Sequence, residues 1–260
     1  MKLGDLVIGA ALLAGVVCYG QLGPPGGRAG RPFGAAGFGQ HPGKAVTGEP
    51  YSADVSNTVV QTLSDGNTIQ CTMNGQVARD ALGRTYSQET ITGGFFGQAG
   101  TTTMIFISDP VNGYAYVLNP ATKVATRRAL RQPNSTGSTG RVPGAHTAGE
   151  RPNTTVADLG TQVVNGVSAQ GKMTTHTVPA GTMGNAQPIV ANSETWYSPD
   201  LQVVVASKRS DARLGTSTYA LTNIQRAAPN AALFEVPSGY TIKDAPAGRG
   251  FGGPHGSTAQ

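Results

Sequence analysis

The sequence predicts an all-β fold, a curved antiparallel sheet of about eleven strands that stays open as a half-barrel, with few or no helices. Three observations predict it. Short alternating or β-branched runs recur along the chain, and turn-forming dipeptides such as Asp-Gly, Asn-Gly and Asn-Pro separate them. No long segment shows a convincing helical period. Because the connections are short, the strands form a hairpin meander, and a β-sandwich is the alternative architecture.

The first two predicted strands, residues 58–63 and 68–79, each lead into a turn that holds an aspartate and a glycine. In the second turn Asp80 comes first and Gly83 last, which are the preferences of a type I turn. The aspartate then accepts backbone amide protons, and the glycine takes the left-handed conformation that leads into the next strand at Arg84. We therefore interpret Asp80 and Arg84 as turn residues rather than as a functional acid–base pair.

Further strands are predicted at residues 104–108, 114–118, 161–164, 194–197 and 201–208, each bounded by turn residues. Residues 121–130 come closest to a helical pattern. The Asn119-Pro120 pair directly before them favours a hairpin instead.

Two of the predicted strands, residues 104–108 and 201–208, are apolar on both faces. Such a strand lies between two layers, or it has one face on the core and the other on a cavity. A packed sandwich core explains the pattern without a ligand, whereas a cavity turns the same side chains into ligand contacts. The candidate ligand-binding residues are Met104, Phe106, Tyr114, Tyr116, Leu118, Trp196, Val203 and Val205.

The first 20 residues have the layout of a secretory signal peptide: Lys2, an apolar run over residues 6–17, and then small residues. The run is shorter than the roughly 20 residues that span a bilayer, so no transmembrane span is expected in the mature chain. Cleavage after Gly20 is expected, and lipidation of Cys18 is disfavoured because Val17 is a poor residue before a lipobox cysteine. The protein is therefore predicted to be periplasmic or extracellular, with Cys71 as a small buried residue of a strand.

Three Gly/Pro-rich segments, residues 21–50, 127–153 and 245–260, are predicted to be disordered because they contain few large apolar side chains. They carry net charges of +2, +4 and +1, whereas the whole chain carries +5. One β domain, residues 51–244, is expected, interrupted by a flexible basic loop at 127–153. The candidate residues for contact with anionic surfaces are Arg127, Arg128, Arg131, Arg141 and Arg151.

No catalytic, metal-binding or cofactor-binding residue can be assigned from the sequence. His41, His146 and His255 lie in the Gly/Pro-rich segments, and His176 has no second ligand at zinc spacing. The "STGSTG" stretch lies in the predicted loop, where no fixed base would activate a serine. The expectation is a protein that is not an enzyme and needs no cofactor.

Two resemblances add to this interpretation. The order of segments such as "VVQTLSDGNTIQ", "ARDALGRTY" and "ISDPVNGYAYVLNPATK", over most of residues 51–244, resembles an uncharacterised family of secreted proteins of acidobacterial type. The rhythm that starts at Leu159, "LGTQVVNGVSAQG", and the closing "LFEVPSGY" are similar to the periplasmic lipoprotein carriers LolA and LolB and to the stress regulator RseB. That resemblance implies an unclosed barrel whose apolar concave face holds acyl chains.

Two functions follow as hypotheses. The first is a secreted or periplasmic binding protein that accepts a lipid, an acyl chain or another hydrophobic ligand on its curved sheet. The second is a structural or adhesive envelope protein whose basic loops contact an anionic envelope polymer. Nucleic acid is excluded as a partner, because no aromatic-basic strand pattern of the RNA-binding kind is present.

Overall fold

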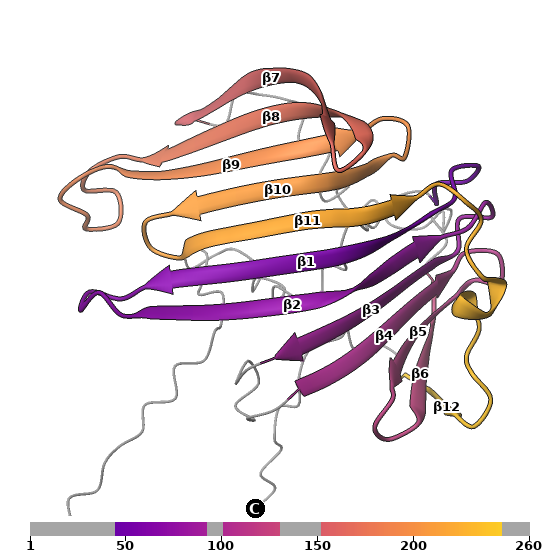
Figure 1. Ribbon diagram of the computed structural model, residues 1–260. Helices are drawn as coiled ribbons and strands as arrows, with labels where there is room; N and C mark the ends of the chain where they lie inside the picture. The colour runs from indigo at the N-terminus through magenta and orange to yellow at the C-terminus, as the bar shows by residue number, and fades with distance from the viewer. Residues whose placement is uncertain (1–44, 93–100, 131–151, 246–260) are drawn as a thin grey trace, which may run out of the picture.

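The computed structural model describes residues 45–92, 101–130 and 152–245, which form twelve β-strands and one short 3-10 helix, η1 (Figure 1). The first six strands are β1 (Tyr51–Thr62), β2 (Thr68–Arg79), β3 (Thr85–Thr92), β4 (Thr101–Asp109), β5 (Tyr114–Asn119) and β6 (Val124–Ala129). The next five are β7 (Thr154–Val164), β8 (Val167–Val178), β9 (Ile189–Ser198), β10 (Val203–Asp211) and β11 (Gly215–Gln225). The chain then forms η1 (Ala231–Phe234) and β12 (Thr241–Asp244).

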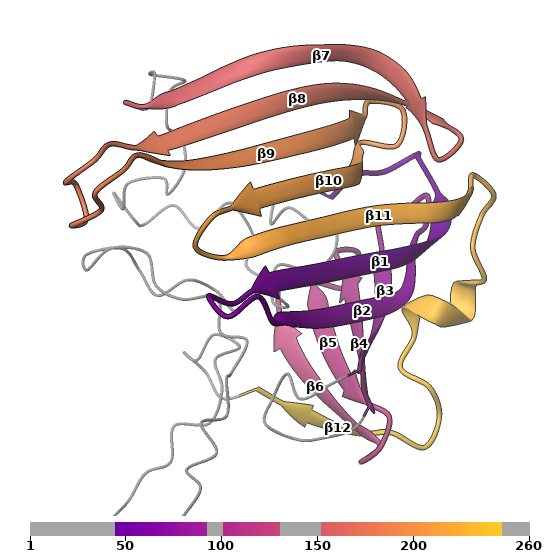
Figure 2. The ribbon, with the colours of Figure 1, turned by 60° about the vertical axis from the view of Figure 1, so that its left-hand side comes forward.

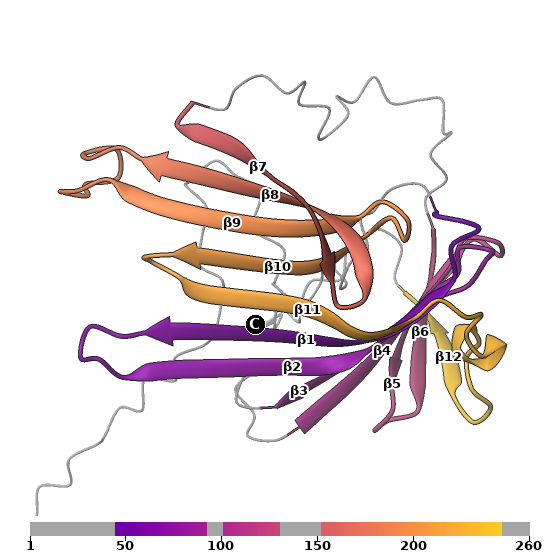
Figure 3. The same cartoon turned by 45° about the horizontal axis from the view of Figure 1, so that its top comes forward.

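All twelve strands belong to one hydrogen-bonded sheet, in the order β12-β6-β5-β4-β3-β2-β1-β11-β10-β9-β8-β7. Neighbouring strands are antiparallel, except that β12 runs parallel to β6. The sheet curls strongly, yet its edge strands β7 and β12 stay apart (Figures 2 and 3). The prediction of an open, curved antiparallel sheet is confirmed. The alternative of a two-sheet sandwich is wrong for the described residues.

The turn at Asp80 has the role that the sequence predicts. One carboxylate oxygen of Asp80 accepts hydrogen bonds from the backbone amides of Leu82 and Arg84, at 3.0 and 2.8 Å. Gly83 has a φ of 80°, in the left-handed region. The other carboxylate oxygen lies 2.6 Å from Nε of Arg84, whose guanidinium also stacks on the ring of Phe234. The pair therefore serves the fold, and β3 begins one residue after Arg84.

Two separate clusters of buried side chains hold the curled sheet. The first core lies among β1, β2 and the strands β8 to β11, and consists of Tyr51, Ala53, Val55, Val77, Val167, Ala169, Trp196, Leu201, Val203, Val205 and Leu221. The second core lies between strands β2 to β6 and the helix η1, and consists of Ala78, Tyr86, Ile107, Leu118, Ala125 and Phe234. Burial of these apolar surfaces is the main source of stability.

A buried arginine connects segments of the first core that lie far apart in the sequence. The guanidinium of Arg79, only 6% exposed, donates two hydrogen bonds to the backbone oxygen of Glu49, at 3.0 and 2.8 Å. It donates a third to the backbone oxygen of Leu201, in the β9–β10 turn, and lies over the ring of Tyr51. Arg79 thus joins the entrance of β1, the end of β2 and a distant hairpin.

Some of the predicted strands are too short. Strand β1 begins at Tyr51 and β7 at Thr154, well before the predicted starts at residues 58 and 161. In β1 every second residue from Tyr51 to Asn57 is buried, although Ser, Asp and Asn occupy intervening and terminal positions that suggest turns. Cys71 is buried in β2, as predicted. Arg127 and Arg128 lie in β6, so the basic loop predicted to begin at residue 127 is wrong at that end.

Candidate functional site

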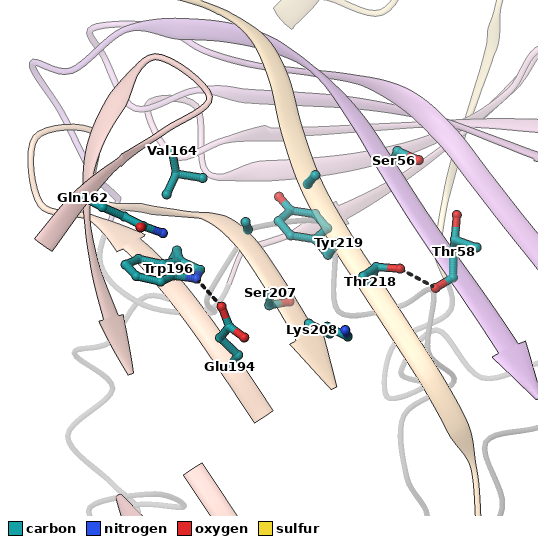
Figure 4. A pocket seen from close by; sticks show the side chains of 12 residues that line it. Ser56, Thr58, Gln162, Val164, Glu194, Trp196, Ser207, Lys208, Thr218 and Tyr219 are labelled. Carbon is teal, nitrogen blue, oxygen red and sulfur yellow. Dashed lines mark hydrogen bonds between the residues drawn. The ribbon is translucent and has the colours of Figure 1, made fainter. Parts of the chain in front are cut away.

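A groove lies between the end of β7 and the face of the sheet that β9, β10, β11 and β1 form (Figure 4). Its volume is about 360 Å³. Val164 and Gln162 of β7 line one side, and Trp196 of β9 lies beside them. We call it the Trp196 groove.

Two rows of side chains cross the floor of the Trp196 groove, because the strand register places them opposite one another. The apolar row runs from β9 to β11 through Trp196, Ala206 and Ala220, and it ends at the hydroxyl group of Ser56 on β1. The polar row beside it runs through Glu194, Lys208, Thr218 and Thr58. The floor therefore offers an apolar track next to a track of hydroxyl groups and two opposite charges.

The indole of Trp196 is fixed in position by two neighbours. Its Nε1 donates a hydrogen bond of 2.7 Å to a carboxylate oxygen of Glu194. Gly171 of β8 lies directly opposite Trp196, and a Cβ at that glycine would lie only 2.5 Å from the indole ring. Because Gly171 has no side chain, the indole lies against β8. Only 9% of Trp196 is exposed, so the ring is part of the first core and of the groove at once.

The β7–β8 turn is anchored over the sheet by Asn165. Its side-chain amide donates a hydrogen bond of 2.7 Å to the backbone oxygen of Leu221 in β11. Asn165 and Gly166 have φ values of 49° and 87°, as the predicted Asn-Gly turn requires. This contact holds the end of β7, with Val164, above the groove floor.

A buried acid lies away from the Trp196 groove, on β3. Glu89 is 2% exposed and is placed by the register between Gly75 of β2 and Met104 of β4. Among the described residues, no group donates a hydrogen bond to its Oε1. Burial raises the pKa of Glu89 to about 7. The carboxyl group is therefore largely protonated in slightly acidic solution.

The predicted ligand-binding residues do not form one surface. Trp196 lines the Trp196 groove, whereas Val203 and Val205 are buried in the first core. Leu118, fully buried, and Tyr116 pack in the second core, where Tyr114 lies near Tyr116. Phe106 is opposite Val117 in the register, so Phe106 and Met104 lie on the other face of the sheet from Leu118. Contact of these residues with a ligand stays a prediction.

Sequence reasoning missed most of the groove. Gly171, Val164 and Ala206 carry no local signal, because they meet only through the register and the curl of the sheet. The signal that was present is Trp196, the single tryptophan of the chain, in a predicted strand.

Arg127 is engaged within the protein. Its guanidinium binds both carboxylate oxygens of Asp244, at 2.8 and 3.2 Å, and lies over the ring of Tyr114. Arg128 is half-buried in the same strand. Arg131, Arg141 and Arg151, together with the predicted signal peptide, lie outside the described residues. A role for these arginines at anionic surfaces stays a prediction.

The described residues contain no group of three or more His, Cys, Asp or Glu side chains that would hold a metal ion. Within the same residues, no helix has the length and apolar character needed to cross a bilayer. His176 of β8 is hydrogen-bonded to Thr154 through Nδ1 at 3.0 Å.

No family model matches the sequence, and no curated protein matches it. Several solved structures resemble its fold. A conserved protein from Thermus thermophilus has 8% identity and a TM-score of 0.40, over 76% of this chain and 91% of that one. The lipoprotein LppX from Mycobacterium tuberculosis has 15% identity and a TM-score of 0.33, over 70% and 90%. A LolA superfamily protein from Nitrosomonas europaea has 10% identity and a TM-score of 0.28, over 72% and 90%. The solved structures that are similar to this chain thus include a member of the LolA superfamily.

Proposed function

We propose that this protein is a non-enzymatic binding protein of the cell envelope or exterior, which holds the apolar part of a lipid or similar molecule in the Trp196 groove. The observation that carries the proposal is the groove itself. Its volume of about 360 Å³ lies within the range of small-molecule sites. Secretion rests on the signal peptide that the sequence predicts.

The apolar row of the groove favours an apolar ligand. Ala206 and Ala220 are small, so the floor beside Trp196 is open to a chain or ring that lies across the strands. Each Å² of apolar surface that such a ligand removes from water contributes about 25 cal/mol. Because Glu194 and Gly171 already fix the indole, little side-chain entropy is lost when a ligand binds.

The polar groups of the groove are better suited to orienting a ligand than to catalysis. The carboxylate of Glu194 accepts the indole N–H, and Lys208 is exposed to solvent. No activated nucleophile with an adjacent base is found among the residues that line the groove. These features support a binding role.

Quenching of Trp196 fluorescence tests the proposal, because this residue is the only tryptophan. A fatty acid brominated at mid-chain should quench the emission in a saturable manner, and the unbrominated acid should compete. Native mass spectrometry of protein purified from its own host should show a bound apolar molecule. The proposal is wrong if quenching does not saturate and the purified protein carries no such molecule.

A pair of variants places the ligand. Ala206→Phe fills the apolar row, and it should weaken binding of the fatty acid by at least tenfold. Ala157→Phe adds the same side chain at an exposed position of β7, away from the groove lining, and should leave binding unchanged. If the two variants bind the fatty acid with equal affinity, the ligand binds outside the Trp196 groove.

A further inference from the structure

A second groove crosses the neighbouring strands β11, β1, β2 and β3, and its chemistry is different. Its volume is about 500 Å³. The polar side chains that line it are Asp54, Ser56, Asn74, Gln76, Gln88, Thr90 and Thr222. We call it the Gln76 groove. Ser56 lines both grooves, so the Gln76 groove adjoins the Trp196 groove.

The register aligns the polar side chains of the Gln76 groove in rows across the strands. One row runs through Thr222, Asp54, Gln76 and Gln88, and the next through Ser56, Asn74 and Thr90. Side chains opposite one another on antiparallel strands project from the same face. Amide, hydroxyl and carboxylate groups therefore converge on one strip of the sheet.

A backbone irregularity positions the carboxylate in this groove. The register between β1 and β11 shifts between Ser52 and Asp54, and Asn223 has a φ of 52°, in the left-handed region. The bulge directs the amide of Asn223 to Asp54, where it donates a hydrogen bond of 2.7 Å to Oδ2. Nε2 of Gln76 donates a hydrogen bond of 3.5 Å to Oδ1 of Asp54. Bulges are frequent next to functional sites, where they re-aim side chains.

The donor and acceptor groups of the Gln76 groove match a ligand rich in hydroxyl groups. Amides and hydroxyls both donate and accept hydrogen bonds, as sugar hydroxyls do, and Asp54 supplies further acceptors. None of the described residues that line the groove is a lysine or arginine, so an anionic ligand would meet no opposite charge. We propose that the Gln76 groove binds a neutral glycan. The proposal stands independently of the ligand of the Trp196 groove.

Two other interpretations of the Gln76 groove predict different binding results. A plain solvated sheet face also carries Thr, Asn and Gln, but it would bind no glycan. A polar peptide also offers donors and acceptors, but its binding would show no preference for sugar hydroxyls.

Calorimetric titration of the full chain with maltohexaose and with the hexamer of N-acetylglucosamine tests the proposal. At least one should bind saturably. The double variant Gln76→Ala/Gln88→Ala should weaken that binding at least tenfold. Gln170→Ala removes an exposed amide of β8 that does not line the groove, and it should leave binding unchanged.

A further variant separates binding from folding. Asn223→Gly keeps the left-handed conformation, because glycine adopts it without strain, but removes the donor to Asp54. It should weaken glycan binding severalfold while the circular dichroism spectrum is unchanged. The proposal is overturned if neither glycan binds, if only the anionic polymer alginate or a polar peptide binds, or if binding persists in both groove variants.

Discussion

Replacement of Glu89 by glutamine should stabilise the protein at alkaline pH and have little effect at acidic pH. The pKa of this carboxyl group is raised from 4.5 to about 7 by burial. Between these values the folded state holds a proton that the unfolded state has released. The contribution of Glu89 to stability is therefore greatest at and below pH 4.5, falls as the pH rises through this window, and levels off above pH 7.

The magnitude follows from the size of that rise. At 1.36 kcal/mol for each pKa unit, a rise from 4.5 to about 7 corresponds to about 3 kcal/mol of stability lost by pH 8. Glutamine resembles the neutral carboxyl group and does not ionise. Glu89→Gln should therefore exceed the wild type by up to about 3 kcal/mol at pH 8, and by far less at pH 4.5.

Urea unfolding followed by Trp196 fluorescence at the two pH values measures this difference. Glu235→Gln, at an exposed position after η1, is the matched control and should change stability little at either pH. The reasoning fails if the difference between Glu89→Gln and the wild type is the same at pH 4.5 and pH 8.

Three further changes test other parts of the structure. Arg79→Lys removes the paired hydrogen bonds to Glu49 and should lower the free energy of unfolding by about 2 kcal/mol in urea titrations, since bonds from charged donors contribute most. An unchanged midpoint would contradict this role of Arg79. Gly171→Ala places a methyl group against the indole of Trp196 and should cost about 1–3 kcal/mol and shift its emission maximum. An unshifted spectrum would mean that the indole is free to move. Leu118→Ala leaves a cavity in the second core and should cost about 2–5 kcal/mol by thermal or urea unfolding, and a loss below about 1 kcal/mol would contradict its core position.

The parts of the fold that the sequence predicted are those that depend on neighbours in the chain. The turns at Asp80 and at Asn165-Gly166 form where expected, because a carboxylate cap and positive φ values are local requirements. The hairpin at Asn119 forms for the same reason, since its side chain accepts amide protons from residues 121 and 122.

The parts that could not be predicted depend on distant contacts. Strand β12 has four exposed residues and pairs in parallel with β6, so it has neither a hairpin partner nor a buried face as a signal. In the candidate site, Trp196 was recognisable as an aromatic residue in a strand. Its neighbours Gly171 and Val164 were not, because the register of β8 and β9 and the curl of β7 bring them together.

The position of β1 has a consequence for the order of folding. This strand lies inside the sheet, between β2 and β11, and residues such as Val55 and Leu221 meet only after the whole chain between them is available. Pairing over so long a separation gives a high contact order and slow closure. During synthesis, one side of β1 stays unpaired and open to association with other chains until β11 emerges. Protection of this edge of β1 until β11 has paired with it would thus raise the yield of native protein.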